Sequence, residues 1–491
     1  MPKATTASFV LTLRLETEND ILDKRFRIAN HIHNILVKHA RRCLSQLKQD
    51  KQYKSIIKNY SKNKTFQKGD KTLLSDLRQH YGLSEYQFHN YVKKQKHLFS
   101  NHIDINTAQK IATNVWQSVS NNLFKKGKFV HFNKLKDFSS VEGKTNTSGI
   151  RYNKQKVYWK GLVLPVRIKK KDAYAKECLN NNSIKYCRIV RKWHKHSHYY
   201  YVQLVMKGIP PLKHKFDSKD TRSVGIDAGT STMAVVSDDN IIFTELAHKA
   251  VKIEKDIIRL NRKSNRQRHA NNPLNYNQDG TIKRNSKTFH RNWIISRRHR
   301  LTIDRMKMLY RKRSEMLRYE HNKLANEILL TCGSDIYAEQ MSYKSLQKRS
   351  SKTEISEKTG TFKKKKRFGK SLQNHAPSMF LNIINTKLSY IGKHICYVNT
   401  QKTRCSQFNH ISGECQKATL SERWKQLSNE IIVQRDLYSA FLLQHAQDQE
   451  TIDTNACIAA FDGFKILHNK VIQDLKQKKQ EGTRYPSCMG I

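Results

Sequence analysis

Acidic residues are scarce in this sequence of 491 residues, which has 40 Asp and Glu against 93 Lys and Arg. The formal net charge of +53 would destabilise a compact chain through self-repulsion unless a polyanion neutralised it. This imbalance excludes an ordinary metabolic enzyme. It favours nucleic acid as the main partner, with a membrane surface as the weaker alternative.

Long apolar runs are also absent. No segment approaches the ~18 apolar residues that cross a bilayer, and residues 1–20 lack the apolar stretch and cleavage site of a signal peptide. The nine cysteines are scattered and odd in number, and no CxxC pair occurs, which argues against a disulfide framework. We therefore expect a cytoplasmic protein with reduced thiols and no membrane partner.

Hydrophobic spacing divides the first 212 residues into two structural types. Residues 9–15 alternate with period two, which predicts a half-buried strand, and short β-rich runs return between residues 157 and 206. Between them, apolar residues recur at steps of three and four, which predicts one buried helix stripe of Leu22, Phe26, Ala29, Ile32, Leu36, Ala40, Cys43 and Leu47. We interpret residues 1–16 and 128–212 as a β-barrel interrupted by a helical insert at 17–127.

Two prolines, Pro210 and Pro211, end this first module because neither can donate a hydrogen bond to a strand ladder. We expect a second domain over residues 220–491. It begins with a strand, a tight turn at Gly229 that permits close backbone approach, and a second strand over 223–237. It continues into basic helices at 250–330 and a Lys-rich loop at 345–370.

Candidate phosphate contacts gather in these helices and in the loop. A solvated helix face is the alternative interpretation, but Lys and Arg greatly outnumber the local carboxylates that could pair with them. The candidates are Arg262, Lys263, Arg266, Arg297, Arg298, Arg300, Arg305 and Arg311 in the helices, and Lys363, Lys364, Lys365 and Arg367 in the loop.

Three carboxylates occupy positions that suggest chemistry. Asp227 and Glu339 each end a short strand-like run, and Asp436 lies in a helix predicted over 430–444 with apolar neighbours along its stripe. Each acid alone has a structural alternative: a turn-forming Asp, a surface Glu and an Arg-paired Asp. Together, in a chain of charge +53, they predict a nuclease site, because convergent hard oxygens hold the two divalent ions that hydrolyse phosphodiesters.

The runs 225–229, 336–339 and 435–440 around these acids resemble the three split motifs of a RuvC-like domain with the RNase H fold. Their context is similar to that of TnpB-like proteins, the transposon-encoded RNA-guided nucleases related to compact type V CRISPR effectors. The resemblance covers roughly residues 152–440 and implies a multidomain α+β and α/β protein. Its parts would be a wedge β-barrel, a helical recognition insert and a RuvC-like nuclease domain with a basic helical insertion.

The resemblance also implies partners and ligands. They are a guide RNA and target DNA in a prokaryotic cytoplasm, with Mg²⁺ held by Asp227, Glu339 and Asp436. The oligomeric state is left open. Two alternatives remain: a guided DNA-binding protein that has lost cleavage, and a conventional DNA transposase, because RNase H-fold strand transfer uses similar metals.

This sequence departs from the family pattern in two places. Tyr438 stands where many relatives carry Asn two residues after the third acid, and Ala228 stands where Leu is usual. Relatives also place two CxxC pairs between the second and third motifs, whereas this chain offers Cys396, Cys405, His410 and Cys415, of which the last three are the possible zinc ligands in a finger-like insert at 400–427. We therefore expect a degenerate finger held by packing around Phe408, Leu420 and Trp424, with zinc disfavoured.

Overall fold

The computed structural model describes residues 7–16, 19–124, 127, 129–194, 197–211, 216, 219–286, 288–355, 360, 368–417, 419, 422–447 and 449–491. The chain forms two compact units, Met1–Leu212 and Lys213–Ile491. Pro210 and Pro211 directly precede this division. Among the described helices, none combines the length and apolar content needed to cross a bilayer.

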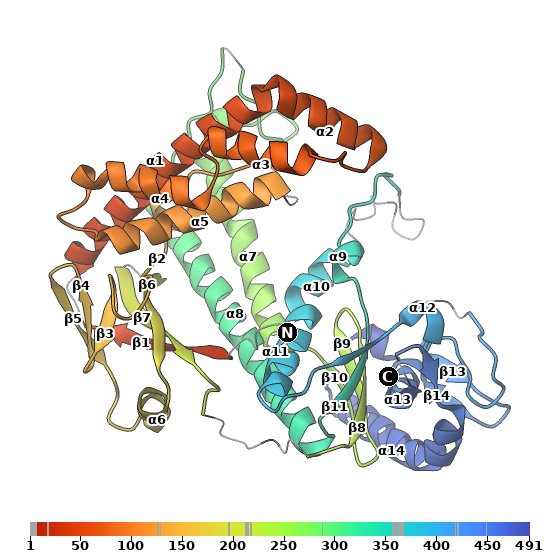
Figure 1. The fold of residues 1–491 in the computed structure, drawn as a ribbon. Helices are drawn as coiled ribbons and strands as arrows, with labels where there is room; N and C mark the ends of the chain where they lie inside the picture. Colours follow the sequence, from red (N-terminus) through yellow and green to blue (C-terminus); the bar gives the residue numbers. More distant parts are fainter. Residues whose placement is uncertain are drawn as a thin grey trace. The chain divides into compact units, whose positions relative to one another are not determined.

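The first unit contains a seven-stranded antiparallel sheet in the order β2-β6-β7-β1-β5-β4-β3 (Figure 1). The strands are β1 Ser8–Leu15, β2 Ser140–Glu142, β3 Arg151–Asn153, β4 Lys156–Trp159, β5 Leu162–Arg167, β6 Ile184–His194 and β7 Ser197–Lys207. Within the described strands no ladder joins the two edges, β2 and β3, which have three residues each. The predicted interrupted barrel is therefore a curled half-barrel, because its edge strands are too short to close it.

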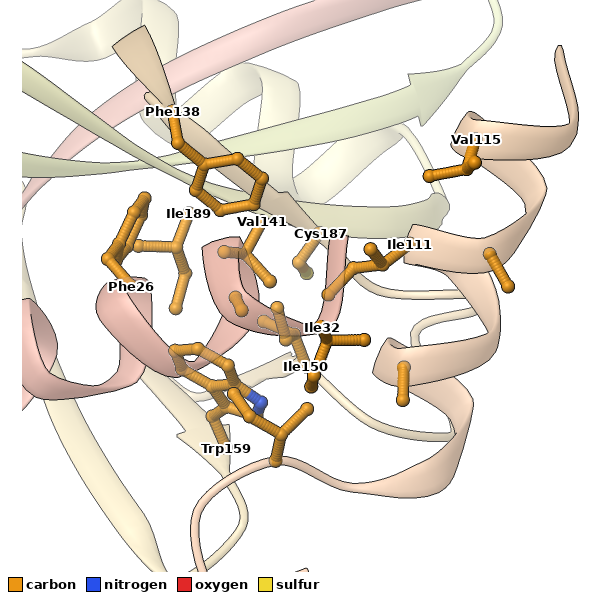
Figure 2. Close-up of a cluster of buried hydrophobic side chains, with 14 of the residues drawn as sticks. Phe26, Ile32, Ile111, Val115, Phe138, Val141, Ile150, Trp159, Cys187 and Ile189 are labelled. Carbon is orange, nitrogen blue, oxygen red and sulfur yellow. The ribbon is translucent and has the colours of Figure 1, made fainter. Parts of the chain in front are cut away.

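Helices follow β1 before the sheet resumes. They are α1 Asn19–Gln49, α2 Lys51–Asn63, α3 Asp70–His80, α4 Glu85–Lys94 and α5 Ile105–Phe124, while α6 Ala173–Asn181 lies between β5 and β6. All eight residues of the predicted stripe on α1 are buried, which confirms that helix. Figure 2 shows the core where Phe26 and Ile32 of α1 meet Val141, Trp159 and Ile189 of the sheet.

The second unit is built on a five-stranded sheet in the order β10-β9-β8-β11-β12. The strands are β8 Ser223–Ala228, β9 Thr232–Val236, β10 Ile241–Glu245, β11 Asp335–Glu339 and β12 Cys396–Val398. The first three form antiparallel hairpins, as the pattern over 223–237 predicts, while β8, β11 and β12 run parallel.

Helices cover both faces of this sheet. On one face, side chains of β8 such as Val224 and Ile226 pack against α8 Arg297–Thr331 and α11 Pro377–Ser389. On the other face, residues of β9 and β10 pack against α13 Arg435–Gln444 and α14 Thr454–Gln480. Since side chains alternate along a strand, Gly225 and Asp227 face α13.

The remaining elements connect these layers. They are α7 His248–Ala270, η3 Pro273–Asn275, α9 Tyr343–Leu346, α10 Gly369–His375, α12 Thr400–Thr403, β13 Trp424–Gln426, β14 Ile432–Gln434, β15 Ala446–Gln447, β16 Thr451–Ile452 and η4 Ser487–Met489. The helix predicted from residue 430 begins only at Arg435, because residues 432–434 pair with β13 as a strand.

Candidate active site

Two of the predicted acids lie at the carboxyl ends of neighbouring parallel strands. Ala338 of β11 is in register with Ile226 of β8, and both side chains belong to the core on the α8 side. The next residues, Glu339 and Asp227, therefore share the opposite face, toward α13. Ligand sites of open sheets form at such carboxyl ends.

Gly225 allows α13 to cross directly over β8. A Cβ at this position would lie 1.8 Å from the carbonyl oxygen of Ala440 and 2.5 Å from the backbone nitrogen of Gln444. The predicted close backbone approach at Gly229 is a separate contact, since a Cβ there would lie 3.3 Å from the carbonyl oxygen of Thr232. The amide of Gly229 donates to the carbonyl of Thr232 at 3.0 Å, which confirms the tight turn predicted between β8 and β9.

This crossing brings the third acid to the other two. Asp436 precedes Ala440 by one helical turn, about 6 Å. Asp227 follows Gly225 by two strand residues, about 7 Å. Asp436 and Asp227 therefore lie at similar distances from the point where α13 crosses β8. Together with Glu339 they line one cavity of about 560 Å³.

The first turn of α13 is fixed by Gln434. Its side-chain oxygen accepts a hydrogen bond from the amide of Leu437 at 2.8 Å, and its side-chain nitrogen donates to the carbonyl of Met489 at 3.3 Å. The first turn of a helix favours an acid such as Asp436 because the helix dipole is positive there. The expectation that Asp436 has apolar helical neighbours before it in the sequence is wrong, because Ile432 and Val433 belong to strand β14.

The electrostatics of the cavity are those of crowded acids. Burial, then the charges of Asp436 and Glu339, raise the pKa of Asp227, while Arg435 opposes the shift. Burial also raises the pKa of Glu339. Arg435 lies 3.5 Å from a carboxylate oxygen of Asp436. In the described part of the chain, the carboxylates of Asp227 and Glu339 have neither a hydrogen bond nor an ion pair.

Mg²⁺ prefers carboxylate oxygens, and these three half-buried acids fit that chemistry. However, among the described residues no three His, Cys, Asp or Glu side chains are arranged as a ready set of metal ligands. The fold thus brings the predicted ligands to one cavity without placing their oxygens around a common point.

Three further residues of the site were missed from the sequence. Arg423 and Arg435 line the cavity and supply its positive charge. The hydroxyl of Tyr343 donates to the carbonyl of Ala228 at 2.9 Å, which ties α9 to the end of β8. Only Arg435, adjacent to Asp436, had a sequence signal.

The finger-like insert is attached to α13 through Tyr438. The Tyr438 hydroxyl accepts a hydrogen bond from the amide of His410 at 3.1 Å and lies 2.7 Å from Nδ1 of the same histidine. Tyr438 is fully buried in the core, so this departure from the family pattern serves packing. Lys425 donates to the carbonyl of Phe408 at 2.6 Å and lies 5.1 Å from the Tyr438 ring centroid.

The possible zinc ligands differ in their surroundings. Cys405 and His410 are buried, whereas Cys415 is exposed. Burial lowers the pKa of His410 to about 4 and that of Lys425 to about 8. Of the three packing residues that the sequence suggested, Phe408 and Trp424 contact the core, and Leu420 lies outside the described residues.

The basic helices α7 and α8 form an antiparallel hairpin (Figure 1). Carboxylate oxygens of Glu320 accept the amides of Lys249 and Ala250 at 3.0 Å, and Arg313 pairs with Glu254. Arg311 is half-buried and lies 3.8 Å from Glu315. Seven candidates are exposed and pair with no carboxylate of the described chain: Arg262, Lys263, Arg266, Arg297, Arg298, Arg300 and Arg305. The loop candidates Lys363, Lys364, Lys365 and Arg367 lie outside the described residues.

Comparisons with known proteins give structural matches only. No family model and no curated protein matches the chain. A Cas12f1-sgRNA-target DNA complex is similar over 89% of this chain and 98% of its own, with 11% identity and a TM-score of 0.42. A CRISPR-Cas12f ternary complex is similar over 88% of this chain and 82% of its own, with 12% identity and a TM-score of 0.26.

Proposed function

We propose that this chain is a magnesium-dependent, RNA-guided DNA endonuclease with a RuvC-like site. The convergence of Asp227, Glu339 and Asp436 on one cavity is the observation that carries the proposal. The five-stranded sheet supports it, because three antiparallel strands followed by two parallel ones is the order of an RNase H-like fold. The acids lie on β8, β11 and the first turn of α13, as the split motifs imply.

The three carboxylates would hold Mg²⁺, which activates water and stabilises the leaving oxygen of a phosphodiester. Arg423 and Arg435 would bind the phosphate beside the acids, since a guanidinium matches phosphate geometry with two parallel hydrogen bonds. Tyr343 would hold the end of β8, and with it Asp227, through its bond to Ala228. Gln434 would orient Asp436 by capping α13.

Guidance by RNA rests on two supports. The split motifs resemble those of guided nucleases, and the α7–α8 hairpin presents exposed cations that pair with no described carboxylate, as phosphate tracking requires. A guide RNA and target DNA are therefore the proposed partners. In that arrangement base pairing would select the target while the chain contacts phosphates.

A guided binding protein without cleavage is the second candidate. The absence of a ready ligand set among the described acids favours it. The Tyr438 departure does not favour it. The Tyr438 ring lies in the core, and its hydroxyl already contacts the backbone amide and Nδ1 of His410. No observation specifically favours the conventional transposase.

The test uses the full chain purified with its bound RNA, which is sequenced to design a matched DNA. The wild type is expected to cleave this DNA in Mg²⁺ and to be inactive in EDTA, while Asp227→Asn binds the same DNA without cutting it. Asp220→Asn, just before the amino end of β8, is the matched control and should keep cleaving.

Two outcomes would decide against the proposal. Equal cleavage by the wild type and Asp227→Asn would refute the site. Specific binding by a wild type that never cleaves would establish the guided binding protein instead.

A further inference from the structure

The loop between α7 and α8 holds apolar side chains on a fixed backbone. The side chain of Asn272 donates to the carbonyl of Ile294 at 3.0 Å and accepts from its amide at 2.6 Å. The side chain of Asn275 donates to the carbonyl of Asn292 at 2.6 Å. Both Asn272 and Asn275 are buried, so residues 272–275 are clamped against 292–294.

This clamp presents apolar groups to solvent instead of hiding them. Leu274 is 77% exposed, Ile294 is 62% exposed and Ile295 is 48% exposed, and Trp293 is also exposed. We call these four residues the apolar tip. Several exposed apolar side chains on one hydrogen-bonded loop are typical of a binding surface, because a loop without a partner would gain by folding such side chains inward.

The surroundings of the apolar tip define the charge of its partner. Residues 260–305 contain twelve Lys and Arg but only two acids, Asp279 and Asp304. Asp304 is engaged by Lys307 at 3.0 Å. The guanidinium of Arg268 lies 5.5 Å from the centroid of the Trp293 ring. The partner should therefore be a polyanion that also offers apolar faces.

Nucleic acid meets both conditions only at particular places. Along an intact duplex the outer surface consists of phosphates and sugars, whereas the flat faces of bases are accessible at helix ends, junctions and single strands. Apolar side chains such as Ile, Leu and Phe pack on base faces where bases are unstacked, and within a duplex they must first separate neighbouring base steps at a cost of a few kcal/mol.

We propose that the apolar tip packs against base faces exposed at an end or junction of the bound nucleic acid, while the flanking arginines hold the phosphates. This inference deepens the proposed function and names the part of the nucleic acid that the hairpin contacts. The cations supply affinity for any polyanion, and the apolar tip adds a preference for unpaired or terminal bases.

The test compares two pairs of isoleucines in the same unit. Ile294→Ser with Ile295→Ser alters the apolar tip, and Ile458→Ser with Ile466→Ser on α14 is the matched control, since Ile458 and Ile466 are 59% and 69% exposed. All four positions are exposed, so thermal stability should change little. The probe is an RNA–DNA heteroduplex of about 20 base pairs carrying 2-aminopurine at its last pair or at an internal pair.

The variant of the apolar tip is expected to bind the probe about tenfold more weakly. It should also lose the fluorescence change of the terminal 2-aminopurine while the internal label is unaffected. The salt dependence of its binding affinity should match that of the wild type, because Arg297 and Arg298 remain to neutralise phosphates. Arg297→Gln with Arg298→Gln should instead reduce the slope of log affinity against log salt by about 0.9 for each duplex phosphate that the variant no longer neutralises.

The inference would be overturned if the variant of the apolar tip and the control variant on α14 bound the heteroduplex with equal affinity. A variant of the apolar tip that changes self-association, or binding to another protein, without altering the 2-aminopurine signal would also overturn it. Binding is measured in EDTA, so failure of cleavage would refute the proposed function while leaving this result intact.

Discussion

The two ends of the five-stranded sheet carry acids in contrasting settings. At the amino end, Asp220 is paired with Arg222 at 3.0 Å, and Asp335, the first residue of β11, is paired with Lys393 at 2.7 Å. At the carboxyl end of the same two strands, Asp227 and Glu339 have no ion-pair partner among the described residues and lie near Asp436.

The difference separates structural acids from those available for chemistry. Hydrogen bonds from Arg222 hold the pKa of Asp220 below its ordinary value, whereas burial and neighbouring acids raise the pKa of Asp227. In a chain with 93 Lys and Arg, cations for neutralisation are plentiful. Carboxylates left without them at one sheet end reduce stability, a cost that functional sites commonly carry.

The largest expected effect comes from displacing α13 from the carboxyl ends of β8 and β11. Gly225→Ala would drive a methyl group into the backbone of Ala440 and Gln444, and should cost about 3 kcal/mol of unfolding free energy and abolish cleavage. Chemical denaturation and a cleavage assay measure both effects.

The matched control for this change is Gly463→Ala in α14, where nothing lies within 4 Å of the added Cβ. It should stabilise the helix by about 0.5–1 kcal/mol. If both glycine variants unfold at the same denaturant concentration, the crossing at Gly225 is not as close as described.

A smaller effect should distinguish the acids themselves, with opposite signs at the two ends. In EDTA, Asp220→Asn should destabilise the chain by about 2 kcal/mol, because hydrogen bonds to a charged partner are lost. Asp227→Asn should stabilise it by about 1 kcal/mol, because a crowded charge is removed. Denaturant midpoints at neutral pH give both values, and a loss of stability in both variants would contradict the comparison.

The pH dependence of these two variants follows from their pKa shifts. Because the pKa of Asp227 is raised in the folded chain, its ionisation lowers the free energy of unfolding. This destabilisation is absent below pH 3.8, the ordinary pKa of Asp, and grows as the pH rises. The advantage of Asp227→Asn should therefore widen with pH. The lowered pKa of Asp220 means that its contribution is present above 3.8 and is lost as the pH falls further, so the deficit of Asp220→Asn should vanish in acid.

The smallest expected effect concerns the finger-like insert beside the carboxyl end. Tyr438→Phe removes the hydroxyl that contacts His410 and should cost about 1 kcal/mol, measured by thermal unfolding. A zinc chelator should leave the melting temperature unchanged, because Lys425 and Tyr438 already satisfy polar groups of the insert. A chelator-induced fall would show that the insert depends on metal.

Local patterns predicted much of this fold. The period-two run at 9–15 is β1, the stripe from Leu22 to Leu47 is the buried face of α1, and residues 223–237 form the β8–β9 hairpin. Local patterns failed where pairing decided the structure: residues 432–434 were expected in a helix but pair with Trp424–Gln426 as a strand.

The candidate site was predicted in its acids but not in its supports. Asp227, Glu339 and Asp436 stand out because a carboxylate at a strand end or beside apolar residues is unusual. Arg423 and Tyr343 carry no such local signal, since a single Arg in a loop or a single Tyr at the start of a short helix resembles many others. Their roles depend on segments that meet only in the folded chain.

By itself, the sequence determined the excess of positive charge, the periodicity of the strands and helices, and the identity of the three acids, because these properties belong to residues and their spacing. Only the tertiary structure decided that Gly225 allows the backbone crossing that brings Asp436 to the strand ends. It also decided which carboxylates form ion pairs with Lys or Arg. Both outcomes depend on distances between residues far apart in the chain, which spacing alone does not fix.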